Sequence, residues 1–142
     1  MNKRQRIMKE LIVEAKTDNL DRVTAFLDEQ LESMGCSMKI QIQLDVAVEE
    51  IFVNIASYAY ESGTGDAVIR ISHEDNPDRA VITFIDEGIP YDPLAKEDPD
   101  VSLSAEEREI GGLGIFMVKK TMDDMKYQRL DGKNVLTLVK NI

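Results

Sequence analysis

The sequence has very little cysteine and no long apolar run. Its one cysteine, Cys36, excludes an internal disulfide framework and a metal cluster held by cysteines. No stretch approaches the roughly 20 apolar residues that a membrane-spanning helix needs. The basic N-terminus, residues 1–9, also lacks the apolar core of a signal peptide. We therefore expect a cytoplasmic protein that does not bind a membrane.

Basic charge is scarce as well. The chain has 17 Lys and Arg against 27 Asp and Glu, a net charge of −10, and the basic residues form no long cluster. Because nucleic acids are bound through Lys and Arg, this argues against nucleic acid as a direct partner. It leaves room for a single nucleotide, which backbone amides and a metal can bind. The excess acid is typical of a solvated surface, although a basic protein partner would also fit.

The 142 residues, 43% of them hydrophobic, are enough for one domain, residues 1–142, to bury a core without metals or disulfides. Apolar residues at steps of three and four predict helices, and β-branched runs bounded by turn residues predict strands. The expected elements are an edge strand Ile7–Ala15, a helix Leu20–Met34 ended by Gly35, a helix from about Lys39 to Tyr60 stopped by Gly63 and Gly65, strands Val68–Ser72 and Ala80–Ile85, a short helix from Ile115 to about Met122, and strands Tyr127–Leu130 and Asn134–Val139.

The order of these elements predicts an α+β sandwich. Adjacent hairpins favour a mainly antiparallel sheet, covered on one face by the helices, over a doubly wound parallel sheet. Residues 87–110 are rich in Pro, Asp, Glu and Ser. Such a long irregular connection in a compact domain is typical of a lid or a binding loop.

Two side chains of the second helix are candidates for chemistry. Glu50 and Asn54 are four residues apart, so they lie on one helix face, beside the apolar stripe and near the boundary between core and solvent. Glu50 could accept a proton from a hydroxyl group. Asn54 could bind Mg²⁺ through its amide oxygen. A partly exposed Glu–Asn pair without a function is the plainer interpretation of the spacing.

A second candidate follows the strand that ends at Ile85. Asp86 precedes a turn in which Gly88 can take backbone angles that are costly for other residues. Asp is common at strand ends as a turn former. Alternatively, its carboxylate could accept the exocyclic amine of adenine, with Gly88 allowing the base to approach closely.

A third candidate is the glycine-rich run Gly111-Gly112-Leu113-Gly114, which leads directly into a helix. Glycines let backbone N–H groups turn inward, and a helix N-terminus favours anions. A flexible hinge would use the same residues. The run lacks the Lys-Ser/Thr ending of a Walker loop, which argues against that nucleotide fold. These features occur in a fixed order: Glu50 and Asn54, then Asp86, the polar stretch and the glycine run. Together they indicate an ATP site.

These blocks resemble a known family. Glu50-x-x-x-Asn54 is similar to the N box of the Bergerat (GHKL) ATPase fold. The segment from Asp86 to Pro93, Asp-Glu-Gly-Ile-Pro-Tyr-Asp-Pro, resembles its first glycine box, and Gly111–Ile115 resembles the second. The Pro-Tyr-Asp-Pro variant and the short length are similar to the stand-alone anti-sigma-factor serine kinases.

The resemblance implies a kinase that transfers the γ-phosphate of ATP to a serine of a STAS-domain anti-anti-sigma protein and sequesters a sigma factor or another client. It implies a homodimer, with an ATP lid at about residues 90–112. Arg22, on the first helix, is a candidate partner contact. The implied site roles are Glu50 as general base, Asn54 as Mg²⁺ ligand, Asp86 as adenine contact, and Tyr58, Gly88, Ile89, Gly111, Gly112, Leu113, Gly114 and Ile115 as further ATP-binding residues.

Two departures from the family pattern are visible. Tyr58 stands where the family commonly has His, so the switch between neutral and cationic forms is lost, although Tyr can still pack or hydrogen-bond near the phosphates. Pro90 replaces the second glycine of the first box and stiffens the turn. Since phosphoryl transfer depends chiefly on positioning and charge neutralisation, neither change removes an essential part.

Two other functions remain as alternatives. The first is an ATP-binding module that sequesters its client with little or no kinase activity; Glu50 argues against it, because sequestration needs no base. The second is the catalytic domain of a histidine kinase, but the only histidine, His73, is predicted in a solvated turn. The remaining scattered residues, Met117, Met122 and Met125, are expected to fill the core.

Overall fold

The computed structural model describes residues 8–61, 63–95 and 112–142. The predicted lid, at about 90–112, therefore lies mostly outside the described residues. The elements are β1 (Met8–Glu14), a short 3₁₀ helix η1 (Thr17–Asn19), α1 (Leu20–Ser33), α2 (Met38–Tyr58), β2 (Asp66–Glu74), β3 (Arg79–Asp86), α3 (Gly112–Thr121), β4 (Asp124–Leu130) and β5 (Lys133–Asn141).

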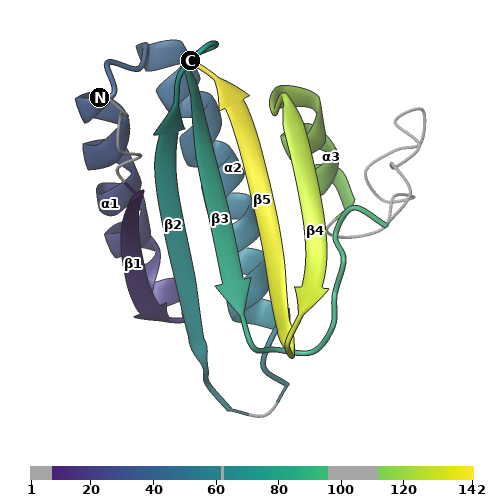
Figure 1. The fold of residues 1–142 in the computed structure, drawn as a ribbon. Coiled ribbons are helices and arrows are strands. Elements are labelled where there is room, and N and C mark those ends of the chain that lie inside the picture. Colours follow the sequence, from purple (N-terminus) through teal and green to yellow (C-terminus); the bar gives the residue numbers. More distant parts are fainter. Residues whose placement is uncertain (1–7, 62, 96–111) are drawn as a thin grey trace.

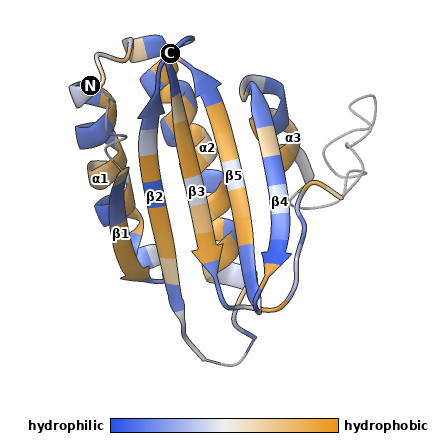
Figure 2. Cartoon of the chain, viewed as in Figure 1, coloured by the Kyte–Doolittle hydropathy of each residue, from blue (hydrophilic) through white to orange (hydrophobic). Residues whose placement is uncertain are grey.

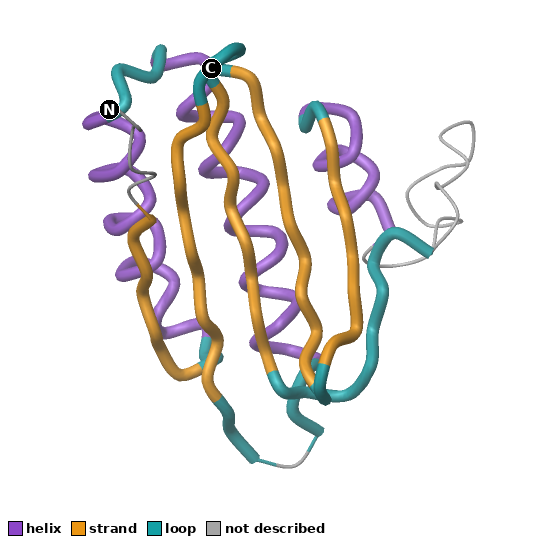
Figure 3. The backbone as a smooth tube through the Cα atoms, in the orientation of Figure 1, coloured by secondary structure: helices purple, strands orange, loops and turns teal. Residues whose placement is uncertain are grey.

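The strands form one five-stranded sheet in the order β1-β2-β3-β5-β4. Each of the four pairings is antiparallel. The three helices lie on the same face of this sheet (Figures 1 and 3). The predicted two-layer α+β sandwich is confirmed, including the edge strand near the N-terminus. β4, the other edge strand, is mostly hydrophilic (Figure 2).

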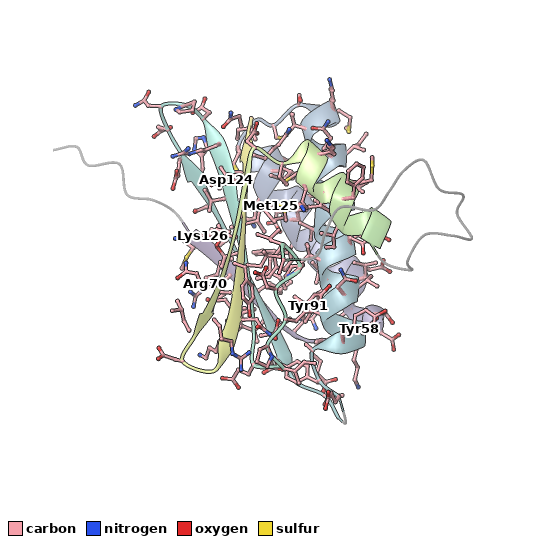
Figure 4. The ribbon with its side chains drawn as sticks, turned by 90° about the vertical axis from the view of Figure 1, so that its right-hand side faces the viewer. Tyr58, Arg70, Tyr91, Asp124, Met125 and Lys126 are labelled. Carbon is pink, nitrogen blue, oxygen red and sulfur yellow. The ribbon has the colours of Figure 1, made fainter. Side chains whose placement is uncertain are left out.

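Alternation along the strands separates the two faces of the sheet. In β3, Ala80, Ile82, Phe84 and Asp86 are buried, whereas the residues between them are partly exposed. Because side chains alternate along a strand, the buried set faces the helices. Arg70 and Lys126 lie toward the opposite face (Figure 4). The same alternation therefore brings Asp86, at the end of β3, to the helix side.

The central helix α2 buries a stripe of apolar side chains against the sheet. Its N-cap Ser37 accepts a hydrogen bond from the Ile40 amide at 3.3 Å, which satisfies one free N–H of the first turn. The helix ends at Tyr58, two residues before the predicted end. Tyr60 has left the helix, and its hydroxyl donates to the Asp66 carbonyl at 2.7 Å. The buried residues of α2 are Gln41, Leu44, Ala47, Val48, Ile51 and Phe52.

Three further expectations need correction. The third helix begins at Gly112, three residues before the predicted Ile115. Met117 is 50% exposed and does not fill the core, whereas Met122 is buried and Met125 packs against the core as predicted. His73 belongs to the end of β2, and its Nε2 lies 3.3 Å from Oδ1 of Asp78.

Among the described residues, no helix combines the length and the apolar character needed to cross a membrane.

Two carboxyl groups meet where α1 packs against α2. A hydrogen bond between the side chains of Asp45 and Asp28 needs a proton on one of them, because two carboxylates have no donor. Burial, the hydrogen bond with Asp28 and the charge of Asp28 raise the pKa of Asp45 from 3.8 to about 7. Oδ1 of each residue is buried without a hydrogen-bond partner. The pair is therefore a local cost of folding once both groups are ionised.

Replacing Asp45 by Asn should stabilise the protein at pH 8 by about 1 kcal/mol, after allowance for solvent screening. The folded state holds the proton up to a pH of about 7 and the unfolded state only to about 3.8. The proton on Asp45 therefore stabilises the folded wild-type protein at low pH, and this stabilisation is lost as the pH rises from about 3.8 to about 7. Urea unfolding of both proteins at pH 5 and pH 8 tests this, with Glu29→Gln as an exposed control on α1. An equal difference at both pH values would contradict it.

Candidate functional site

The candidate residues of α2 lie along one side of that helix. Glu50 and Asn54 are both partly buried, and Tyr58, one turn further on, is 59% exposed. The predicted position of Glu50 and Asn54, between core and solvent, is confirmed. Tyr58 lies on the helix side of the sheet, as does Tyr91 (Figure 4). The three α2 side chains therefore follow one line from Glu50 to the end of the helix.

Glu50 is next to the first turn of α3. A Cβ atom added at Gly114 would collide with the Glu50 carboxyl group, so the absence of a side chain there makes room for the carboxyl group. Burial, and to a lesser extent the charge of Glu49, raises the pKa of Glu50. A carboxylate whose proton affinity is raised in this way is better suited to accept a proton.

The other members of the second glycine box are only partly described. Gly111 lies outside the described residues, and Gly112 and Leu113 belong to the first turn of α3. Ile115 is buried in the hydrophobic core. A phosphate contact from Ile115 would therefore use its backbone amide. These amides lie at the N-terminus of α3, where the helix dipole favours an anion.

Asp86 is only 5% exposed, and its Oδ1 atom closes the turn that follows β3. That oxygen accepts hydrogen bonds from the Gly88 amide and from Nδ2 of Asn134, both at 2.9 Å. A third hydrogen bond supports the turn, because Nη1 of Arg129 donates to the Gly88 carbonyl at 2.8 Å. The carboxylate is thus fixed by donors from two separate segments.

Gly88 is required for a reason that differs from the prediction. It does not adopt a positive φ. Instead, a Cβ atom at this position would collide with the backbone of Ala59, just after the end of α2. The Ile89 amide also donates to the Ala59 carbonyl at 2.9 Å. Glycine therefore lets the turn after β3 pack directly on the end of α2.

A pocket joins these elements, and the space in it, counted together with the open solvent at its mouth, is about 470 Å³. The structure brings Asn54, Tyr58, Asp86 and Ile89 together in its lining, while Glu50 lies outside the lining, toward α3. Apolar walls with a few polar groups are typical of a small-molecule site. The other lining residues are Ile51, Ile55, Ala59, Phe84, Tyr91, Pro93, Tyr127, Asn134 and Leu136.

Of these lining residues, sequence reasoning named only Asn54, Tyr58, Asp86 and Ile89 as site candidates, so it missed the other nine. A signal for one of them was available. In β5 the buried positions are Asn134, Leu136 and Leu138, so the alternation of the predicted strand places an amide on its apolar face. A buried amide needs hydrogen-bond partners, which marks it for attention.

Two other sites lie away from the pocket lining. Arg22 is exposed on α1. His73, Asp75 and Asp78 come within 4.8 Å of one another at the β2–β3 hairpin, where they could approach a metal ion. None of them lines the pocket. The structure therefore connects neither Arg22 nor His73 with the predicted ATP-binding residues.

The donor set fits ATP with Mg²⁺. Asp86 lies among apolar walls that match a flat base, and it can accept a hydrogen bond from an amine. Asn54 supplies a hard amide oxygen on the same face of α2 as Glu50, one turn away. Asp86 and Asn54 therefore have the chemical groups that an adenine contact and a Mg²⁺ ligand require.

Comparisons with known proteins show the family and similar proteins. Residues 13–140 match the family model described as the histidine kinase-like ATPase domain. The chain is 29% identical over 102 residues to the serine/threonine-protein kinase BtrW of Bordetella bronchiseptica, covering 72% of this chain and 71% of that protein. It is 29% identical over 106 residues to the serine-protein kinase RsbW of Listeria monocytogenes, covering 72% of this chain and 67% of that one.

A solved structure has a similar fold. It contains the RsbU and RsbW domains of a Mycobacterium tuberculosis protein, and the TM-score is 0.64 at 16% sequence identity. The match covers 94% of this chain and 32% of that longer chain. At this identity the likeness concerns the fold alone.

Proposed function

The chain belongs to the histidine kinase-like ATPase domain family, and we propose that it is an ATP-dependent protein-serine kinase of the anti-sigma-factor type. Its substrate is a serine of a STAS-domain anti-anti-sigma protein, and it sequesters a sigma factor or another regulatory client. One observation supports this most directly. Asn54 and Asp86 line one pocket, and Glu50, with a raised pKa, lies beside it against Gly114.

The proposed reaction assigns each residue one task. Asp86 accepts the adenine amine, and the first turn of α3 faces the phosphates with its free amides. Asn54 would hold Mg²⁺, which would supply positive charge to neutralise the phosphates. The substrate serine oxygen forms a bond to the γ-phosphorus as the bond to the β–γ bridging oxygen breaks. Glu50 accepts the serine proton, and ADP leaves.

By the same resemblance to the family, we propose a lid, a homodimer and a partner contact. The ATP lid extends over about residues 90–112 of a single ATPase domain formed by residues 1–142. The protein is a homodimer that acts in the cytoplasm, and Arg22 on the exposed side of α1 contacts the protein partner. A cationic side chain there is suited to an acidic surface of that partner.

The decisive experiment incubates the protein with a cognate STAS-domain protein and Mg·ATP. Intact-protein mass spectrometry should show the gain of one phosphate, and fragmentation should place it on serine. Chelation of the metal with EDTA should abolish the transfer, because the metal neutralises the charge on the phosphates. ATP binding without phosphorylation of any cognate STAS protein would contradict the kinase assignment.

That outcome would favour the second candidate, a module that binds ATP only to control sequestration. The position of Glu50 argues for the enzyme, since nucleotide binding alone needs no carboxylate between α2 and α3. The two functions also differ in what co-purifies. A sequestering module should capture its client in an ATP-dependent manner while every associated protein stays free of phosphoserine.

A further inference from the structure

Asn134 is a polar residue on the face of β5 that packs in the core. It is 6% exposed and shares the buried face of β5 with Leu136 and Leu138. A buried amide without hydrogen-bond partners would destabilise the fold. Its partners therefore indicate why it is there.

The hydrogen bonds of this amide are complete. Nδ2 donates to Oδ1 of Asp86 at 2.9 Å and to the Ile89 carbonyl at 2.8 Å. Oδ1 accepts from the Tyr91 amide at 3.3 Å and from the Tyr127 hydroxyl. A primary amide has two donor hydrogens and two acceptor lone pairs, so all four positions are used.

This pattern also fixes the orientation of the amide. The Tyr91 N–H can only donate, and the Ile89 carbonyl can only accept. Rotating the Asn134 amide by 180° would place donor against donor at Tyr91 and acceptor against acceptor at Ile89. The side chain therefore holds a single orientation, with Nδ2 toward Asp86.

The consequence for Asp86 is a defined direction of its free oxygen. Both hydrogen bonds that the Asp86 carboxylate accepts from the described residues go to Oδ1, one from Gly88 and one from Asn134. Oδ2 is thereby the oxygen available to a ligand in the pocket that Asp86 lines. Asn134 reaches across 48 positions of sequence to set this direction.

We propose that Asn134 is a positioning residue that makes the pocket select adenine. It acts through Asp86, by presenting one carboxylate oxygen to the exocyclic amine. Guanine has a carbonyl oxygen where adenine has the amine, so a fixed carboxylate oxygen repels it. This inference rests on the proposed function, in which Asp86 contacts adenine.

The test compares two nucleotides that differ in one group. Purine riboside triphosphate lacks the exocyclic amine of ATP and is otherwise the same. Wild-type protein should bind ATP more tightly than purine riboside triphosphate in calorimetric titrations with Mg²⁺. In Asn134→Leu the affinity for ATP should fall about tenfold, because the carboxylate has lost its charge-assisted donor. Affinity for purine riboside triphosphate should stay within about twofold, since it never used that oxygen.

A loss of affinity shared equally by both nucleotides would overturn the inference, because it would show a merely structural role. A wild-type protein without preference for ATP would overturn it too. Neither result affects the test of kinase activity, because that test measures phosphoserine on the STAS-domain protein. Thr137→Val, on the other face of β5, is the matched control and should change neither affinity. Thermal unfolding checks each variant, and Asn134→Ala replaces Asn134→Leu if the latter does not fold.

Discussion

Replacing Glu50 by Gln should lower the rate of phosphate transfer to a STAS-domain serine by at least about 10²-fold. Affinity for Mg·ATP should stay within about twofold, because Glu50 is not among the residues that line the pocket. Gln has the shape of Glu but cannot take up a proton at neutral pH. Single-turnover phosphorylation, with ATP affinity measured by calorimetry, separates the two effects.

The neighbouring Glu49 provides a matched control. It is exposed, and Glu49→Gln removes the same charge one residue away. Its transfer rate should stay near that of the wild type at pH 8. A base must be unprotonated to act, so the wild-type rate should fall as the pH drops through the raised pKa of Glu50. Removing the Glu49 charge lowers that pKa, which should move the fall to lower pH.

Undiminished transfer by Glu50→Gln would remove the general-base assignment. The reaction would then depend on positioning and charge neutralisation alone. A loss of transfer together with a loss of ATP affinity would point instead to a structural role, since Glu50 also fills the space left by Gly114. The affinity measurement is therefore as informative as the rate.

The fold could be predicted almost entirely from local patterns. The β-branched runs gave β2, β3 and β5, and the apolar spacing gave α1 and α2 to within two residues at each end. These patterns depend only on residues close in sequence, so they can be interpreted without knowledge of the tertiary structure. The resemblance to the anti-sigma-factor serine kinases is confirmed by the family match and by the RsbW and BtrW relatives.

The details of the site could not be predicted in the same way. Gly88 and Gly114 each lack a side chain because a distant segment, Ala59 or Glu50, occupies that space. Asn134 was missed because its partner Asp86 lies on another strand. Such contacts depend on which elements meet, and sequence spacing along one element does not contain that information. The start of α3 was misplaced because glycines are poor helix formers, so the pattern favoured a later start.

Replacing Asp86 by Asn should weaken ATP binding by roughly 10- to 100-fold, the cost of one hydrogen bond to a charged group. Asn keeps an oxygen that can accept from Gly88 and from Asn134, so the turn after β3 is retained. Its amino group then takes the place of Oδ2. Two donors, the new amide and the adenine amine, face each other in a pocket with apolar walls, where neither finds another acceptor.

Calorimetric titration with Mg·ATP tests this, and Glu87→Gln is the control. Glu87 is the next residue and carries the same charge, but it is exposed and lies 3.8 Å from the amine of Lys133. A general loss of negative charge would affect both variants alike, whereas an adenine contact is lost only in Asp86→Asn. Purine riboside triphosphate should bind wild type and Asp86→Asn about equally, because the missing amine is the group that Asp86 would bind. Unchanged ATP affinity in Asp86→Asn would mean that the buried carboxylate only shapes the turn, and that adenine is recognised by other groups of the pocket.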